Sequence, residues 1–287
     1  MTKLVAVTDL KSVAFGRAGS SPAAGTNAGR ISMEEQLYQL DFSGKELRDI
    51  PRIHAGFMTA SCLAASEITI FLRLLLMATN SNRFSSNIAN DAISAYAFTQ
   101  ALVIERSLSG KLLEYIYMID QLQNENKKRP DATITQFLEN IGDRITQIKS
   151  DQSYRLADWY RDHASHHYIV NKISNLVSYV DDQEVYTIYL HEKEGNSGYF
   201  LGEHLLLHKL SDDKDDNNVD RLTKFQDWVL ECSQSIMKIH SEYSVLFINT
   251  FFDEKNIKEL EVDIPNDLLG SLTNTKLPLF WNFNKAT

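Results

Sequence analysis

The segment Trp159–Tyr168 gathers side chains that can handle both a phosphate group and a proton. Arg161 and Asp162 stand directly before a group of three histidines within His163–His167, out of eight histidines in the chain. Arginine presents a planar, permanently charged set of donors that matches phosphate, and histidine exchanges a proton near neutral pH. The segment therefore predicts cleavage of a phosphodiester without a metal. The alternative is a helix whose histidines are half-buried packing residues.

The bulk composition is that of an ordinary folded protein with an acidic balance. The 287 residues are 43% hydrophobic and 23% charged, with a net charge of −9 and a pI of about 5.4, which is normal for a globular chain. An acidic protein has no general attraction for nucleic acid, so binding RNA would require a local basic pocket. Cys62 and Cys232 lie in apolar helical patterns without a nearby second cysteine, which predicts buried, reduced thiols in a cytoplasmic protein.

No stretch of the sequence predicts a membrane span or a secretory signal. The best apolar run, 68–78, is interrupted by Arg73 and is well short of the ~20 residues that cross a bilayer. We therefore expect this run to be a core helix. The N-terminus lacks the apolar segment of a secretory signal.

Residues 1–32 differ in composition from the rest of the chain. The stretch 14–26 is rich in Gly, Ser and Ala and nearly free of large apolar side chains, so it cannot offset its chain entropy and predicts a disordered tail. Its Gly-Ser-Ser-Pro and Gly-Thr sequences resemble the 3′ half of a tRNA gene read as protein, which would make Met33 the true start. Such insertion sites are typical of mobile elements that carry defence or toxin genes. An ordinary flexible tail is the alternative.

Apolar residues at helical spacing predict four antiparallel helices with short connections, which is the pattern of a bundle. The helices are expected over 51–80, about 87–124, 131–149 and about 151–180. Asp131 or Thr133 is the expected N-cap of the third helix, and Asp151 or Ser153 that of the fourth. Gly110 lies inside the second helix, where glycine costs about 1 kcal/mol relative to alanine, and predicts a break or a close helix contact.

Beyond residue 182 the pattern changes to a small β-hairpin over 185–201, with turn residues at 194–198. A short helix over 203–210, an acidic loop over 211–220 and a long final helix over about 221–255 follow. We therefore predict a mostly α fold: a disordered tail (1–32), a helical bundle with an added hairpin (33–210), and a C-terminal region packing on the bundle (211–287).

No metal or cofactor is expected. The acidic loop lacks the ordered ligand spacing of a calcium loop. His163 and His167 have the i, i+4 spacing of zinc ligands, but Ala164 stands where the catalytic zinc motif has glutamate.

The chain resembles HEPN domains, four-helix bundles marked by an arginine, a polar residue and a histidine four to six positions after the arginine. Arg161, Asp162 and either His166 or His167 match that pattern. The resemblance extends to a group of uncharacterised bacterial HEPN-like proteins through His167-Tyr168, through 106–114 in the preceding helix and through the hairpin. It covers roughly residues 50–210.

The resemblance implies a metal-independent endoribonuclease that usually works as a dimer, and many such proteins are toxins or phage-defence effectors. Arg161 would hold the scissile phosphate, His166 or His167 would move a proton, and Asp162, four residues before His166, would orient it. The implied partners are RNA, a second copy through the bundle, and an antitoxin or defence protein. The alternative is a non-catalytic HEPN-like protein that binds RNA, a nucleotide or a partner protein.

A straight helix would not bring these side chains together. His166 would lie about 140° and His167 about 120° around the axis from Arg161. His163 and His167 fall on the apolar stripe, which favours packing for both. The motif therefore requires a kink, a long reach or a dimer, and we favour the dimer because two copies would concentrate positive charge.

Overall fold

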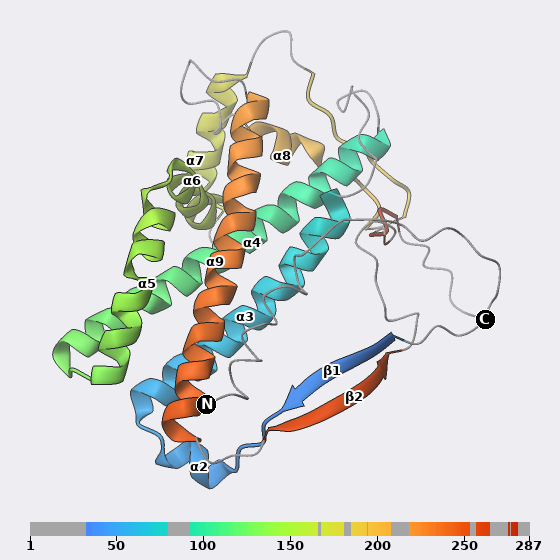
Figure 1. The fold of residues 1–287 in the computed structure, drawn as a ribbon. Helices are drawn as coiled ribbons and strands as arrows, with labels where there is room; N and C mark the ends of the chain where they lie inside the picture. Colours follow the sequence, from blue (N-terminus) through green and yellow to red (C-terminus); the bar gives the residue numbers. More distant parts are fainter. Residues whose placement is uncertain are drawn as a thin grey trace. The chain divides into compact units, whose positions relative to one another are not determined.

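The computed structural model describes residues 33–79, 92–165, 168–180, 185–193, 195–207, 218–252, 257–264, 275 and 277–280 (Figure 1). The chain forms two compact units, a sheet unit (1–49 and 244–270) and a bundle unit (50–243 and 271–287). The predicted mostly α class is confirmed, and a two-stranded antiparallel sheet accompanies the helices. The predicted disordered tail and 211–217 of the acidic loop lie outside the described residues.

The sheet unit contains β1 (Met33–Gln39) and β2 (Lys258–Ile264), paired antiparallel from Met33 opposite Ile264 to Gln39 opposite Lys258. Neither strand was predicted from the sequence. The two strands are separated by more than two hundred residues, so no turn signal between adjacent strands marks the pair.

A short helix, α2 (Gly44–Asp49), follows β1 and begins with a reciprocal cap. The backbone N–H of Ser43 donates to Glu46 Oε2 at 2.7 Å, and the backbone N–H of Glu46 donates to Ser43 Oγ at 3.2 Å. This capping box satisfies two donors that a helix start leaves unpaired. Close by, the ring of Phe42 meets that of Phe252 edge-on, with 4.6 Å between centroids.

The bundle unit is built on four long helices, α3 (Arg52–Thr79), α4 (Ala92–Lys128), α5 (Ala132–Ser150) and α9 (Asn218–Phe251), whose residues from Ser244 onward are counted with the sheet unit. The first three lie close to the predicted ranges, and α9 starts and ends a few residues earlier than predicted. Figure 1 shows α3 and α4 side by side. α4 runs through Gly110 without a break.

Apolar side chains from these helices meet in one core, as their helical spacing predicts. The fully buried members include Ile68, Leu108, Leu112, Leu113, Ile116, Ile134, Ile141, Ile236 and Ile239. Burying each of these side chains contributes about 1.5–3 kcal/mol relative to leaving it exposed. α4 contacts α3, α5, α6 and α8, so described helices surround it on several sides.

The predicted fourth helix does not run on to residue 180. α6 (Gln152–Tyr160), capped by Asp151 as predicted, passes into a π-helical turn, η3 (Arg161–Ser165). A short helix, α7 (Val170–Ser174), and a 3₁₀ turn, η4 (Asn175–Tyr179), follow it.

The apolar pattern that predicted this continuation has little surface to pack on. Tyr168 is 64% exposed, Val170 75% and Val177 58%. In addition, Tyr168 has φ 39°, a left-handed conformation that interrupts a helix. Because few apolar side chains between residues 168 and 180 are buried, packing does not stabilise one straight helix over this stretch.

The predicted hairpin is reduced to a single antiparallel bridge between Tyr189 and Gly198, with N–H to O distances of 2.8 and 2.7 Å. Tyr96 of α4 holds it, because its hydroxyl donates to the carbonyl of Asn196 at 2.7 Å. A Cβ at residue 198 would lie 2.6 Å from the Tyr96 ring, so this close approach requires glycine. The short helix α8 (Phe200–Leu207) follows.

Two expectations about α3 need correction or comment. Cys62 is exposed, so the prediction of a buried thiol is wrong there, whereas Cys232 is buried as predicted, and both are free. Among the described residues, α3 alone is long and apolar enough to cross a membrane, with 28% of its most apolar window buried. Length and composition alone carry little weight, because core helices of soluble proteins meet the same criterion.

Asp131 links three helices at the start of α5. Its Oδ1 accepts the backbone N–H of Ile134 at 3.0 Å, which confirms the predicted N-cap, and its Oδ2 lies 3.2 Å from Nε2 of the buried His54 on α3. The other ring nitrogen of His54 lies 3.1 Å from the hydroxyl of Tyr243 on α9. The cap and the histidine lower the pKa of the Asp131 carboxyl.

Replacing Asp131 with alanine is expected to lower the free energy of unfolding at neutral pH by about 1–2 kcal/mol, since it removes the cap. Asp131→Asn, which keeps a capping oxygen, should lose less. A lowered pKa stabilises the fold above the unfolded value of about 4 and loses that effect as the pH falls through the folded value. Urea denaturation should therefore show a smaller difference between wild type and Asp131→Ala at low pH; an undiminished difference would contradict this role.

Candidate functional site

The predicted motif lies where the helix changes form. At the end of α6 the backbone N–H of Arg161 reaches the carbonyls of both Ala157 and Asp158, and the π-helical turn η3 begins with the same residue. Single π turns inside helical segments often occur at functional sites. Because the turn widens the backbone, the angles of a straight helix do not apply beyond Tyr160.

Arg161 is held in place by an anion and an aromatic ring. Its Nε and Nη2 both donate to Asp162 Oδ1, at 2.9 and 2.6 Å, and Nη2 lies 3.8 Å from Asp158 Oδ1. The guanidinium carbon lies 4.5 Å from the centre of the Tyr117 ring on α4, a cation–π contact. The side chain is 21% exposed, so the cation is both positioned and accessible.

The aromatic support is itself fixed by hydrogen bonds. The hydroxyl of Tyr117 donates to Asp158 Oδ1 at 2.6 Å. Burial, with the Asp158 carboxylate accepting that hydrogen bond, raises the pKa of Tyr117, so the phenol stays neutral. Burial alone would lower the pKa of Arg161, but the hydrogen bond to Asp162 and the nearby negative charges outweigh it, so the pKa of Arg161 is raised. The Arg161 site is therefore a permanent cation on a neutral ring between two carboxylates.

The structure brings Arg161 and Asp162 together and places His163 apart from them. His163 Nδ1 lies 2.9 Å from the carbonyl of Trp159, and its ring stacks on that of Trp159 with 5.0 Å between centroids. This is the packing role that the apolar stripe predicted. His166 and His167 lie outside the described residues. Asp162 is bonded to Arg161, a partner that the sequence reasoning did not assign to it.

Gly110, on α4, faces the side chain of Arg161. A Cβ built there would meet only Arg161 Cγ, at 3.9 Å, which is ordinary van der Waals contact. The predicted close helix contact is therefore present in a mild form, and alanine would fit.

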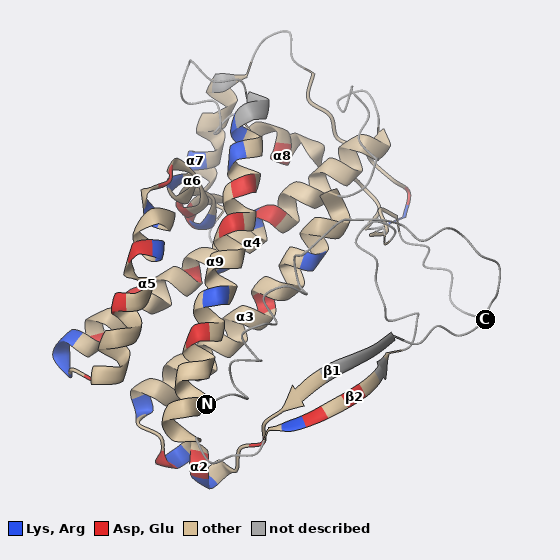
Figure 2. Ribbon diagram, in the orientation of Figure 1, with Lys and Arg blue, Asp and Glu red and all other residues tan. Residues whose placement is uncertain are grey.

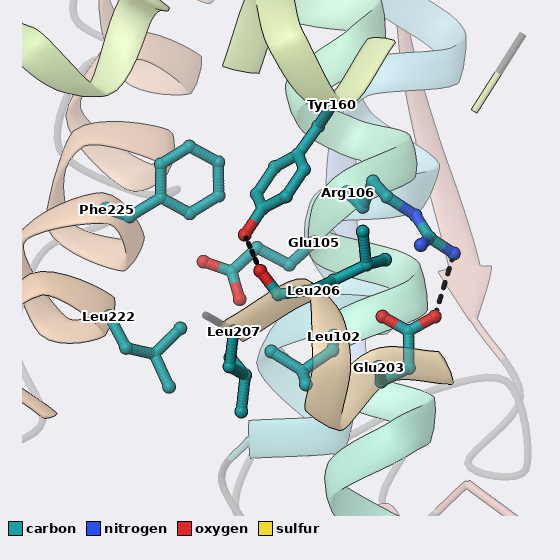
Figure 3. Close-up of a pocket in the computed structure, with 9 residues that line it drawn as sticks. All are labelled: Leu102, Glu105, Arg106, Tyr160, Glu203, Leu206, Leu207, Leu222 and Phe225. Carbon is teal, nitrogen blue, oxygen red and sulfur yellow. Dashed lines mark hydrogen bonds and ion pairs between the residues drawn. The ribbon is translucent and has the colours of Figure 1, made fainter. Parts of the chain in front are cut away.

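A second polar cluster surrounds a small cavity between α4, α6, α8 and α9 (Figure 3). The lining residues are Leu102, Glu105, Arg106, Tyr160, Glu203, Leu206, Leu207, Leu222 and Phe225. Arg106 Nη2 pairs with Glu203 Oε1 at 2.9 Å, and the hydroxyl of Tyr160 donates to the carbonyl of Leu206 at 3.3 Å. The space open to the centre of a water molecule is about 20 Å³.

Glu105 is the unusual member of this cavity. Its side chain is buried, 1% exposed, and burial raises the pKa of its carboxyl to about 8, only partly opposed by Gln226. The group is therefore protonated at neutral pH, which lowers the cost of burying it.

Glu105 was not among the residues that the sequence predicted for a site. The available signal was spacing, because Glu105 falls in register with the buried Ala101, Leu108 and Leu112. A single carboxylate on an apolar stripe is a recognisable departure from the helical pattern.

No protein-family model, no curated protein and no solved structure matches this chain.

Replacing Gly110 with alanine is expected to raise the free energy of unfolding by about 1 kcal/mol, because the new Cβ fits and the unfolded chain loses freedom. Gly56→Ala on α3 is the matched control, since a Cβ there meets nothing within 4 Å. Thermal denaturation of both variants should show similar gains. A loss of stability confined to Gly110→Ala would show that Arg161 needs more room than this contact implies.

Replacing Glu105 with glutamine is expected to remove a pH-dependent loss of stability. A carboxyl whose folded pKa lies above its unfolded pKa loses stability as the pH rises from about 4.5 to about 8 and is constant above that. At about pH 9 the Glu105→Gln variant should be more stable than wild type by about 3–5 kcal/mol, with the gap closing at low pH. Denaturation curves across pH test this; Glu139→Gln, an exposed change on α5, should follow wild type.

Proposed function

We propose that this protein is a HEPN-type, metal-independent endoribonuclease whose phosphate-binding residue is Arg161. The observation that carries the proposal is the placement of Arg161 at a π-helical turn, fixed by the Tyr117 ring and still 21% exposed. A positioned, permanent cation is what stabilises the charge that develops on a phosphate during cleavage.

The helix break supports the proposal. Ile169 donates its backbone N–H to the carbonyl of His163 at 3.2 Å, which joins the two sides of the interruption. In the proposed mechanism, His166 or His167 needs to approach only within hydrogen-bonding reach of the substrate.

The local charge is compatible with binding one phosphate rather than a long nucleic acid duplex. Residues 152–174 contain Arg155, Arg161 and Lys172 against Asp158 and Asp162, a small positive excess in a chain of net charge −9.

Along α9, by contrast, two basic residues, Arg221 and Lys224, are followed by two acidic ones, Asp227 and Glu231 (Figure 2). This helix presents no continuous basic stripe among its described residues. Recognition of RNA therefore depends on the Arg161 segment, and a second copy of the chain would double its positive charge.

In the proposed reaction the RNA 2′-oxygen bonds to phosphorus and the bond from phosphorus to the 5′-oxygen breaks. His166 or His167 accepts the proton of the 2′-hydroxyl or supplies one to the leaving oxygen. Arg161 holds the non-bridging oxygens, first through Nη1, which makes no hydrogen bond within the described part of the chain. Full use of the guanidinium requires Asp162 to give up its contact.

The pairing of Arg161 with Asp162 favours a second candidate, a non-catalytic HEPN-like protein that binds RNA, a nucleotide or a partner protein. An arginine neutralised by its neighbour is a weaker catalyst but a serviceable contact residue. The two candidates differ in whether a covalent bond in RNA is broken.

The test is RNA cleavage by the purified protein in EDTA, followed on gels. Arg161→Ala is expected to lower the cleavage rate by about 10²–10³-fold, and Arg161→Lys should not restore it fully, because lysine lacks the planar fork. Alanine variants of His166 and of His167 should identify the histidine that acts, with a loss of about 10²–10⁴-fold for that residue.

Arg73→Ala is the matched control, because Arg73 is an exposed arginine of α3, outside the 152–174 segment. It should leave the rate near that of wild type. Undiminished cleavage by Arg161→Ala would rule out the assigned role, while RNA binding without cleavage by wild type would favour the second candidate.

A further inference from the structure

The cavity beside Glu105 has the chemistry of a binding site that is separate from the Arg161 site. Glu105 Oε1 is fully buried and has no hydrogen-bond partner among the described residues, and Oε2 has only a long contact, 3.4 Å, from Gln226. Buried polar atoms are paired in most proteins, because an unpaired one costs about 1–3 kcal/mol. An unpaired carboxylate oxygen lining a cavity therefore points to a ligand that supplies positive charge or donors.

Two further oxygens lie at the same end of this cavity. Figure 3 shows the carboxylate of Glu105 beside the hydroxyl of Tyr160 and the carbonyl of Leu206. Leu206 lies in the last turn of α8 (Phe200–Leu207), where carbonyls lack partners within the helix and the helix dipole is negative. The other walls are apolar, from Leu102, Leu207, Leu222 and Phe225.

The charges around the cavity do not balance when Glu105 is ionised. Arg106 and Glu203 neutralise each other at 2.9 Å, with each side chain only 12% exposed. Glu105 is then a single negative charge facing Tyr160 and Gln226, neither of which is a cation. One positive charge in the cavity would therefore neutralise the side chains that line it.

We propose that this cavity binds one small monovalent cation, potassium or ammonium, with the Glu105 carboxylate as its counter-charge and Tyr160 and Leu206 as neutral oxygen ligands. The space of about 20 Å³ suits an ion of this size, because about 10–15 Å³ measured in the same way accommodates one water molecule. A single carboxylate balances one positive charge, so a divalent ion such as calcium would leave an uncompensated charge in this cavity. A quaternary ammonium ion such as choline is too large for this space.

The protonation of Glu105 is linked to this binding. Burial raises the pKa of the Glu105 carboxyl to about 8, so a cation entering at neutral pH displaces a proton, which leaves to solvent. Arg106, Tyr160, Glu203 and Gln226 face the group from α4, α6, α8 and α9. The bound cation should therefore stabilise the protein more at about pH 9 than at about pH 6.

The test is the melting temperature of the full chain at about pH 9 in potassium chloride, ammonium chloride and choline chloride of equal ionic strength. Potassium or ammonium is expected to raise Tm by about 5 °C over choline when present at about 100 times its dissociation constant. Methylammonium chloride distinguishes a bare ion from the head group of a primary amine as the ligand. A Tm shift equal to that in ammonium chloride would indicate a primary amine, and a smaller Tm shift would indicate the bare ion.

Glu105→Gln should abolish the difference between the salts, and Tyr160→Phe should reduce it, while Glu139→Gln should keep it. Equal Tm values for wild type in all the salts would overturn the proposal, as would a shift that survives in Glu105→Gln. Because the readout is stability rather than RNA cleavage, its failure and that of the proposed nuclease are distinguishable.

Discussion

The enclosure of α4 by its neighbours is the constraint on which the bundle unit depends. Helices α3, α5, α6 and α8 all contact it, so the polar side chains along its length meet protein more than water. Arg106 finds Glu203, Tyr117 finds Asp158, and Tyr115 meets Ser61 at 2.9 Å. Each of these bonds fixes a neighbouring helix, because a buried polar group left unpaired costs more than a surface one. Glu105 is the exception, because its buried Oε1 has no hydrogen-bond partner among the described residues.

Much of the fold was predictable because helix starts and apolar helix faces are determined by residues close together in the sequence. Asp131 and Asp151 both cap the helices predicted for them, since a side chain two or three residues from its backbone partner needs no distant information. The core of α3, α4, α5 and α9 followed from helical periodicity for the same reason. The pairing of β1 with β2 was beyond such reasoning, because the register of two distant strands depends on the tertiary fold.

The candidate site was predictable in composition but not in geometry. The residue types of Arg161 and Asp162 drew attention to the segment, yet a straight-helix projection could not anticipate a π-helical turn. Apolar residues such as Val170 and Val177 extended the periodic pattern into a region where they stay exposed. A periodic pattern shows which side chains could be buried on one face of a helix. Whether another part of the protein packs against that face depends on the tertiary fold.

The contact between Arg161 and Asp162 carries a consequence for selectivity. An anion on the adjacent residue competes with any external anion at a high effective concentration, because the chain never lets it diffuse away. A lone phosphate ion, with one contact to offer, is at a disadvantage against such a tethered competitor. Under the proposed function, an RNA strand that makes further contacts beside the bound phosphate would displace the aspartate more readily than a free phosphate ion would.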